Sequence, residues 1–129
     1  MFRRMASTYL VLTTLPARAQ ALALARTLVE EKLAACCNVL GEVQSIYRWK
    51  GAVHSDAEVL CVIKTTVKRF AALKARIQAL HPYEVPEIIA LPIAAGHAPY
   101  LAWLASAVRP GPSAARGSRA ARARRRPGA

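Results

Sequence analysis

The sequence lacks the features of membrane and secreted proteins. No apolar run approaches the length of a membrane-spanning helix. Residues 1–7 contain no apolar segment with a cleavage site, so we expect neither a secretion signal nor a transit peptide. The three cysteines, Cys36, Cys37 and Cys61, form no disulfide framework, because adjacent cysteines pair only with strain. A small, odd number of cysteines predicts reduced thiols and a cytoplasmic location.

Acidic residues are also scarce. The chain has seven Asp and Glu residues and 19 Lys and Arg residues, which gives a formal net charge of +12. The excess is uneven: the chain through Val108 carries 12 basic and seven acidic residues, whereas residues 109–129 hold seven arginines and no acid. The charge therefore predicts a mildly basic domain followed by a strongly basic segment.

The length and composition predict one domain and a tail. The chain has 129 residues, of which 54% are hydrophobic, so it can bury a core. We assign residues 1–108 to a single domain. Residues 109–129 are rich in Arg, Ala and Pro and carry no apolar periodic pattern, which predicts a disordered tail. Such a tail can contact polyanions non-specifically, but it has no aromatic residues to stack on bases.

Hydrophobic periodicity predicts alternating strands and helices. We expect strands over 8–14, 39–50, 58–64 and 87–93, and helices over 16–36, from 66 to 80, and from Pro99 onward. The order β-α-β-β-α-β plus one short helix predicts an α+β, ferredoxin-like fold, with an antiparallel sheet and helices on one face. Pro92 predicts an edge position for the fourth strand.

Two elements carry predictions about which face is buried. The first helix has apolar residues at helical spacing, which we assign to its buried stripe: Leu22, Ala25, Val29, Leu33 and Cys36. The second strand alternates with period two, which places four residues on one side: Val39, Val43, Tyr47 and Trp49.

Four segments together resemble the CutA divalent-cation tolerance proteins over about residues 8 to 108. They are Glu31-Lys-Leu-Ala-Ala-Cys36; Ser45-Ile-Tyr-Arg-Trp-Lys-Gly51 followed by Glu58-Val59 and Ile63-Lys-Thr-Thr66; His81-Pro-Tyr-Glu-Val-Pro-Glu87; and Tyr100-Leu-Ala-Trp-Leu104. The resemblance implies a ferredoxin-like fold, a tight homotrimer, and an association with copper and other divalent cations. It implies no catalytic reaction.

The chain departs from that family at two places. The arginine-rich end extends beyond the family pattern. Bacterial members associated with copper resemble this chain but differ at two positions. They carry a cysteine in the first strand, where this sequence has Thr13, and a His-His pair, where this sequence has Leu80-His81. The resemblance therefore leaves His81 as the one family-type metal ligand.

His81, Cys36 and Cys37 are the candidate metal ligands. A neutral imidazole suits Cu(II), whereas thiolates suit Cu(I). Each has a structural alternative: Cys36 can be a small buried hydrophobic residue, and His81 can interact with the carbonyl groups at the end of a helix. The sequence leaves these alternatives open.

A second group of residues predicts a subunit interface or a cleft between subunits. Large aromatic residues on strand ends and short helices are typical of interfaces, and here they are Tyr47, Trp49, Tyr83, Tyr100 and Trp103. Charged residues in the same motifs could contact an anionic ligand or be solvated, namely Lys32, Glu58, Lys64 and Glu87.

The leading hypothesis is a non-enzymatic homotrimer linked to tolerance of, or response to, divalent metal ions, with copper as the candidate ion. One alternative is a signalling trimer similar to PII proteins that binds a nucleotide or another small ligand between subunits. A second alternative is an enzyme that uses Cys36 or His81 in a cleft between subunits.

Overall fold

The computed structural model describes residues 7–111. Seven elements follow one another along the chain: β1 (Thr8–Leu15), α1 (Arg18–Glu30), β2 (Cys36–Trp49), β3 (Ala52–Thr66), α2 (Phe70–Leu80), β4 (Ile89–Pro92) and α3 (Ala98–Ala107). The predicted β-α-β-β-α-β order with a last helix is confirmed.

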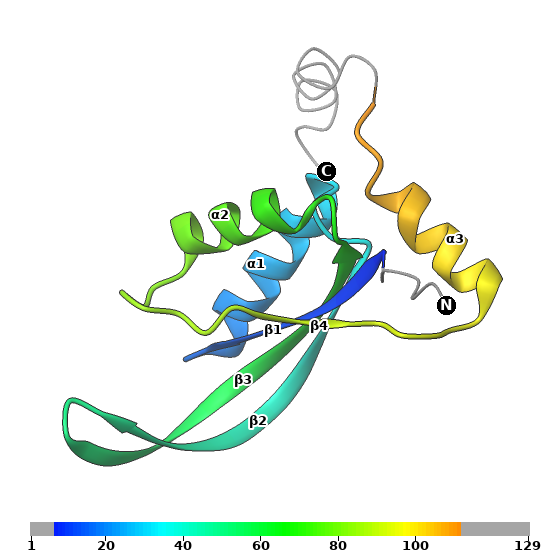
Figure 1. Cartoon of the computed structure of the whole chain (residues 1–129). Coiled ribbons are helices and arrows are strands. Elements are labelled where there is room, and N and C mark those ends of the chain that lie inside the picture. The colour runs from blue at the N-terminus through cyan, green and yellow to red at the C-terminus, as the bar shows by residue number, and fades with distance from the viewer. Residues whose placement is uncertain (1–6, 112–129) are drawn as a thin grey trace, which may run out of the picture.

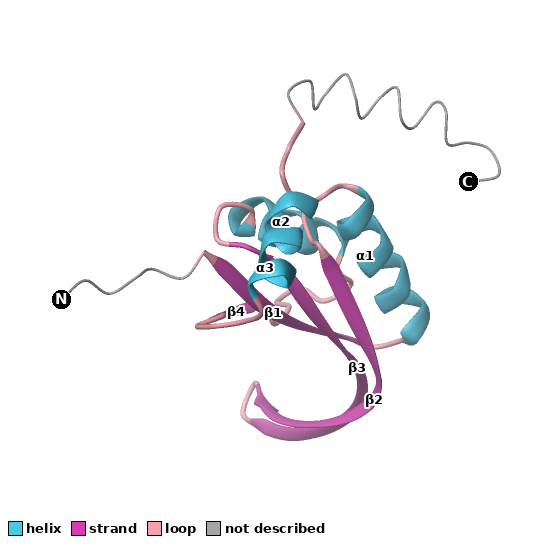
Figure 2. Ribbon diagram, turned by 90° about the vertical axis from the view of Figure 1, so that its right-hand side faces the viewer, coloured by secondary structure: helices cyan, strands magenta, loops and turns pink. Residues whose placement is uncertain are grey.

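The four strands form one antiparallel sheet in the order β2-β3-β1-β4. β1 lies between β3 and β4, as the apolar residues on both of its faces predict for a central strand. β4 lies at an edge, as Pro92 predicts. Helices α1 and α2 cover one face of the sheet, and α3 lies to one side (Figure 1; Figure 2). The predicted ferredoxin-like arrangement is confirmed.

The core lies between the sheet and helices α1 and α2. Alternate residues of β1 and β3 point toward the helices, among them Val11, Leu15, Cys61 and Ile63, each at most 1% exposed. From the helices, Leu28 on α1 and two residues of α2 pack against them.

The predicted buried stripe of α1 is correct for Ala25 and Leu33 and wrong for Leu22 and Val29. The residues that face the core are Ala21, Leu24, Ala25 and Leu28, whereas Leu22 and Val29 are 46% and 40% exposed. The helix also ends at Glu30, not at Cys36, because the chain turns sharply at Lys32, which has a φ of 60°. Apolar residues occupy more than one side of α1, so periodicity alone could not select the buried side.

The predicted face of β2 is correct for Val43, Tyr47 and Trp49 and wrong for Val39. The pairing with β3 shifts between Leu40 and Glu42, which marks a β-bulge at Gly41. An extra residue in one strand reverses which side chains point to each face. Val39 pairs with Cys61 and faces the helices, whereas Val43 pairs with Glu58 and faces away from them.

The face of the sheet that lies away from α1 and α2 is apolar as well. We call it the open face. The register places seven large apolar side chains on it: Leu10, Leu12, Leu40, Leu60, Val62, Ile89 and Leu91. Three of them, Leu40, Ile89 and Leu91, are more than 40% exposed. An antiparallel sheet whose second face met water would instead show polar residues there.

β2 and β3 also extend beyond the rest of the sheet. β1 pairs with β3 only from Val59 to Thr66, whereas β2 pairs with β3 as far as Trp49 and Ala52. Residues 42–49 and 52–58 therefore form a two-stranded ribbon without a third strand, which projects away from the helices (Figure 1). We call this segment the ribbon.

The last helix packs against β3 and against the residue that precedes β2. Leu104 and Val108 are buried against Ala35. Arg109, Pro110 and Gly111 follow without helix or strand. The rest of the predicted tail, residues 112–129, lies outside the described residues, so its disorder stays a prediction, as does the domain boundary.

Candidate functional site

His81 lies where α2 ends, and it joins the following segment to β1. Its side chain is 8% exposed, and its Nε2 atom lies 2.8 Å from the carbonyl oxygen of Thr14. Its Nδ1 atom accepts a hydrogen bond from the backbone N–H of Tyr83 at 3.1 Å. The side chain therefore does not bind the carbonyl groups of α2, which was one of the two predicted alternatives.

These two partners fix the tautomer of His81. A carbonyl oxygen can only accept and a backbone N–H can only donate, so Nε2 carries the proton and Nδ1 carries the lone pair. Burial lowers the pKa of His81, although the Thr14 carbonyl and the Glu58 carboxylate act in the opposite direction. The imidazole is accordingly neutral at pH 7.

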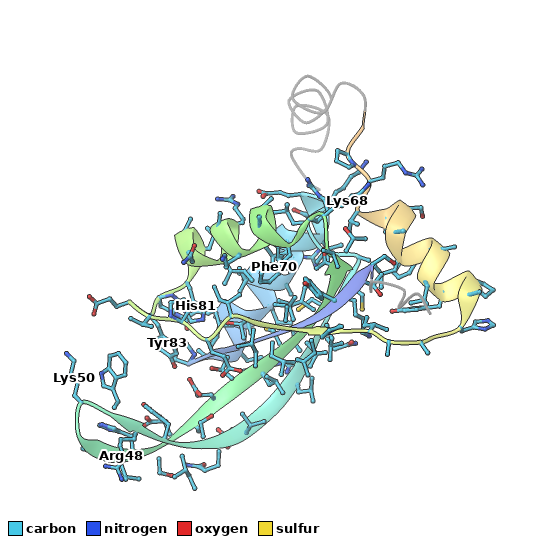
Figure 3. All side chains as sticks on the ribbon, viewed as in Figure 1. Arg48, Lys50, Lys68, Phe70, His81 and Tyr83 are labelled. Carbon is cyan, nitrogen blue, oxygen red and sulfur yellow. The ribbon has the colours of Figure 1, made fainter. Side chains whose placement is uncertain are left out.

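Two tyrosine–carboxylate hydrogen bonds lie near Tyr83, the residue that binds His81. The Tyr83 hydroxyl donates to Glu58 at 2.6 Å, and the Tyr47 hydroxyl donates to Asp56 at 2.6 Å. Burial, together with the bond to Glu58, raises the pKa of Tyr83. The bond to Asp56 raises the pKa of Tyr47. Figure 3 shows Tyr83 next to His81, and their ring centroids are 4.9 Å apart.

The structure thus brings together four of the predicted residues: Tyr47, Glu58, His81 and Tyr83. Sequence reasoning missed Asp56 and the Thr14 carbonyl. Asp56 carries a usable signal, because residues two apart on a strand share a face and Asp56 therefore points to the same side as Glu58. The role of a backbone carbonyl leaves no trace in the sequence.

The three cysteines do not gather at one site. Neighbouring residues of a strand point to opposite faces, so Cys36 and Cys37 cannot act as a pair. The Cys36 thiol contacts Asn38 Oδ1 at 3.8 Å on the open face. The Cys37 thiol meets Cys61 on the helix side, and this hydrogen-bonding contact together with burial raises the pKa of Cys37. All three are free thiols, and the cytoplasmic location stays a prediction.

The other predicted residues lie apart from this cluster. Lys64 donates to Asn38 at 2.7 Å, and Lys32 is exposed at the turn after α1. Tyr100 and Trp103 contact each other on α3, with ring centroids 5.4 Å apart. Two further predicted residues are exposed at separate places, Trp49 at the tip of the ribbon and Glu87 before β4.

The enzyme alternative names Cys36 or His81, and within one chain these two residues do not form a catalytic pair. His81 is held at Thr14, which pairs with Leu60, whereas Cys36 pairs with Lys64, four residues farther along β3. At the usual strand rise, four residues span about 13 Å. A nucleophile and its base must lie within hydrogen-bond reach, so Cys36 and His81 do not meet this requirement.

A hollow of about 380 Å³ lies between the start of α1 and the bulge in β2. Its lining includes Arg18, Gly41, Glu42 and Glu58. Two acidic side chains and one basic side chain border it. Across residues 7–111, no three His, Cys, Asp or Glu side chains form a group that could hold a metal ion.

Comparison with known proteins identifies the family. A family model described as CutA1 divalent ion tolerance protein matches residues 9–107. This chain belongs to that family. The divalent-cation tolerance protein CutA of Thermus thermophilus is 54% identical over 94 residues, which are 73% of this chain and 91% of that protein. Human protein CutA is 46% identical over 91 residues, 70% of this chain and 51% of that protein.

Solved structures of the CutA1 family share the fold. The T. thermophilus protein superposes with a TM-score of 0.78 and 50% identity, over 79% of this chain and 99% of that one. CutA1 from Oryza sativa gives a TM-score of 0.79 with 40% identity, over 83% and 98% of the two chains. The family resemblance read from the four sequence segments is confirmed, and with it the assignment to divalent-cation tolerance.

Among the helices of residues 7–111, none has the length and apolarity needed to cross a bilayer.

The tyrosine–carboxylate bonds differ in burial, and this difference predicts their effect on stability. Glu58 is 8% exposed, so Tyr83→Phe leaves a buried carboxylate without its donor. We expect Tyr83→Phe to lower the free energy of unfolding by about 1–2 kcal/mol.

Tyr47→Phe is the matched control, because it removes the same hydroxyl from the exposed Asp56, to which water can bind instead. Chemical denaturation of both variants at pH 7 measures the difference. An equal loss in the two variants would contradict the importance of burial at Glu58.

Proposed function

We propose that the chain acts as a non-catalytic homotrimer, whose subunits cover each other's open faces, in the tolerance of or response to divalent metal ions. The open face supports the trimer most directly. Its exposed leucine and isoleucine side chains would form a continuous apolar surface on a monomer, and soluble monomers rarely expose such surfaces. Apolar burial contributes roughly 25 cal/mol per Å², so covering this face favours association.

The ribbon also supports association. Ile46 and Val53 are 71% and 63% exposed, and Tyr47 and Trp49 lie on the other side of the same two strands. A two-stranded ribbon is only marginally stable in water by itself. Packing against a neighbouring subunit would both bury these side chains and fix the ribbon.

The trimer predicts that a charge on the open face disrupts assembly. Leu91 on β4 is 44% exposed, and we expect Leu91→Glu to shift the protein toward monomers at micromolar concentration, because burying an unpaired carboxylate is costly. Sedimentation velocity reports the assembly.

Leu22→Glu is the control, since Leu22 is 46% exposed on α1 and lies away from the sheet. It should sediment as the wild-type trimer does. A monomeric wild type, or a Leu91→Glu variant that remains trimeric, would contradict the proposed interface.

We propose further that copper, as Cu(II), binds His81 through Nδ1. A metal-bound histidine usually donates its second ring nitrogen to a carbonyl or carboxylate, and the bond from Nε2 to Thr14 provides this arrangement. Nδ1 then holds the lone pair, although the ion must displace the Tyr83 N–H from it. One imidazole does not complete the coordination of Cu(II), so water or a neighbouring subunit supplies the remaining ligands.

Calorimetry with Cu(II) tests this assignment. The wild type should bind one ion per subunit with one nitrogen ligand in its electron paramagnetic resonance spectrum, and His81→Gln should lose that ion. His97→Gln removes an exposed histidine at the start of α3 and should retain it. Cys36→Ser and Cys37→Ser should also retain it, because thiolates favour Cu(I). Equal Cu(II) binding by all these proteins would exclude His81 as the ligand.

A further inference from the structure

Four basic residues lie at one end of the sheet. The Arg69 side chain donates from Nε to the carbonyl oxygen of Lys32 at 3.3 Å, which joins the turn after α1 to the turn before α2. Lys68 precedes Arg69 in the second of these turns. Arg109 follows α3, whose last turn packs against Ala35, three residues after Lys32. We call Lys32, Lys68, Arg69 and Arg109 the basic pole.

Both ends of the described chain depart from this pole. The carbonyl oxygen of Ser7 accepts a hydrogen bond from the N–H of Val67 at 3.0 Å, so the described chain starts beside the turn that carries Lys68. The six residues before Ser7 include two arginines and no acid. The 18 residues after Gly111 include six arginines and no acid. The sequence therefore adds positive charge at both places where the chain leaves the pole.

The acidic residues of the chain do not neutralise the positive charge of the basic pole. Glu31 is held by Arg76 in a paired hydrogen bond, with both contacts at 2.9 Å, and Glu30 lies 4.0 Å from Arg26. The other five acids lie in the ribbon or between α2 and β4, namely Glu42, Asp56, Glu58, Glu84 and Glu87. Within residues 7–111, no side chain of the basic pole forms an ion pair.

We propose that the basic pole is a binding surface for the phosphate backbone of double-stranded nucleic acid. Clustered lysine and arginine side chains bind phosphates by releasing condensed counterions, without reading the sequence. Single strands are bound through aromatic side chains that stack on bases, and Phe70, the aromatic residue next to Arg69, instead packs edge-to-face on Tyr9.

Fluorescence anisotropy of the full chain with a labelled DNA duplex, measured across a series of salt concentrations, tests the proposal. The pole variant is Lys68→Gln with Arg109→Gln. Its control is Arg48→Gln with Lys50→Gln, which removes the same charge at the tip of the ribbon, far from Lys68 (Figure 3). Each lost phosphate contact lowers the slope of log affinity against log salt by about 0.9, so the pole variant should lose about two.

The expected result is a lower slope and weaker duplex binding in the pole variant, with the control unchanged from the wild type. Three results would overturn the proposal. They are no duplex binding by the wild type at low salt, an equal effect of the two double variants, and loss of binding to phosphatidylserine vesicles with duplex binding unchanged. The last result would assign the pole to an anionic membrane.

Discussion

The rest of the structure depends on how the apolar residues of the open face are buried. Among them are Leu10, Leu12, Leu60 and Val62, which point away from both helices that cover the sheet. Helices α1 and α2 cover one face of the sheet, but both faces of the sheet are apolar. The helix-facing side is closed within the chain, with Val11 and Ile63 fully buried. The other side needs a surface that the described chain does not provide, and in our proposal two further copies supply it.

The proposed metal ligand is connected to this surface through hydrogen bonds. His81 is tied to the end of β1 by Nε2, and Nδ1 is bonded to the backbone of Tyr83. Tyr83 in turn holds Glu58, which lies where the ribbon leaves the sheet. An ion that takes Nδ1 displaces the Tyr83 N–H. The proposal therefore couples metal binding to the segment that positions the ribbon.

The sequence predicts the element order, the central place of β1 and the edge place of β4, because each follows from local patterns. It does not predict the face that α1 buries, since Leu22 and Val29 repeat at helical spacing as well as Leu24 and Leu28 do. The reversal of faces at Gly41 has one signal in the sequence, a glycine inside a strand pattern, and this signal alone does not fix the register. In the same way, Cys37 meets Cys61 only because the register aligns two strands that are distant in sequence.

Hydrogen–deuterium exchange in the ribbon tests most directly whether subunits cover it. Its backbone amides lack a third strand within one chain, so in a monomer they should exchange through frequent local opening. Our account predicts that residues 42–49 and 52–58 are protected at micromolar concentration, and that dilution below the dissociation constant of the trimer removes this protection while the β1–β3 amides stay protected. Fast exchange in the ribbon at every concentration would contradict the account.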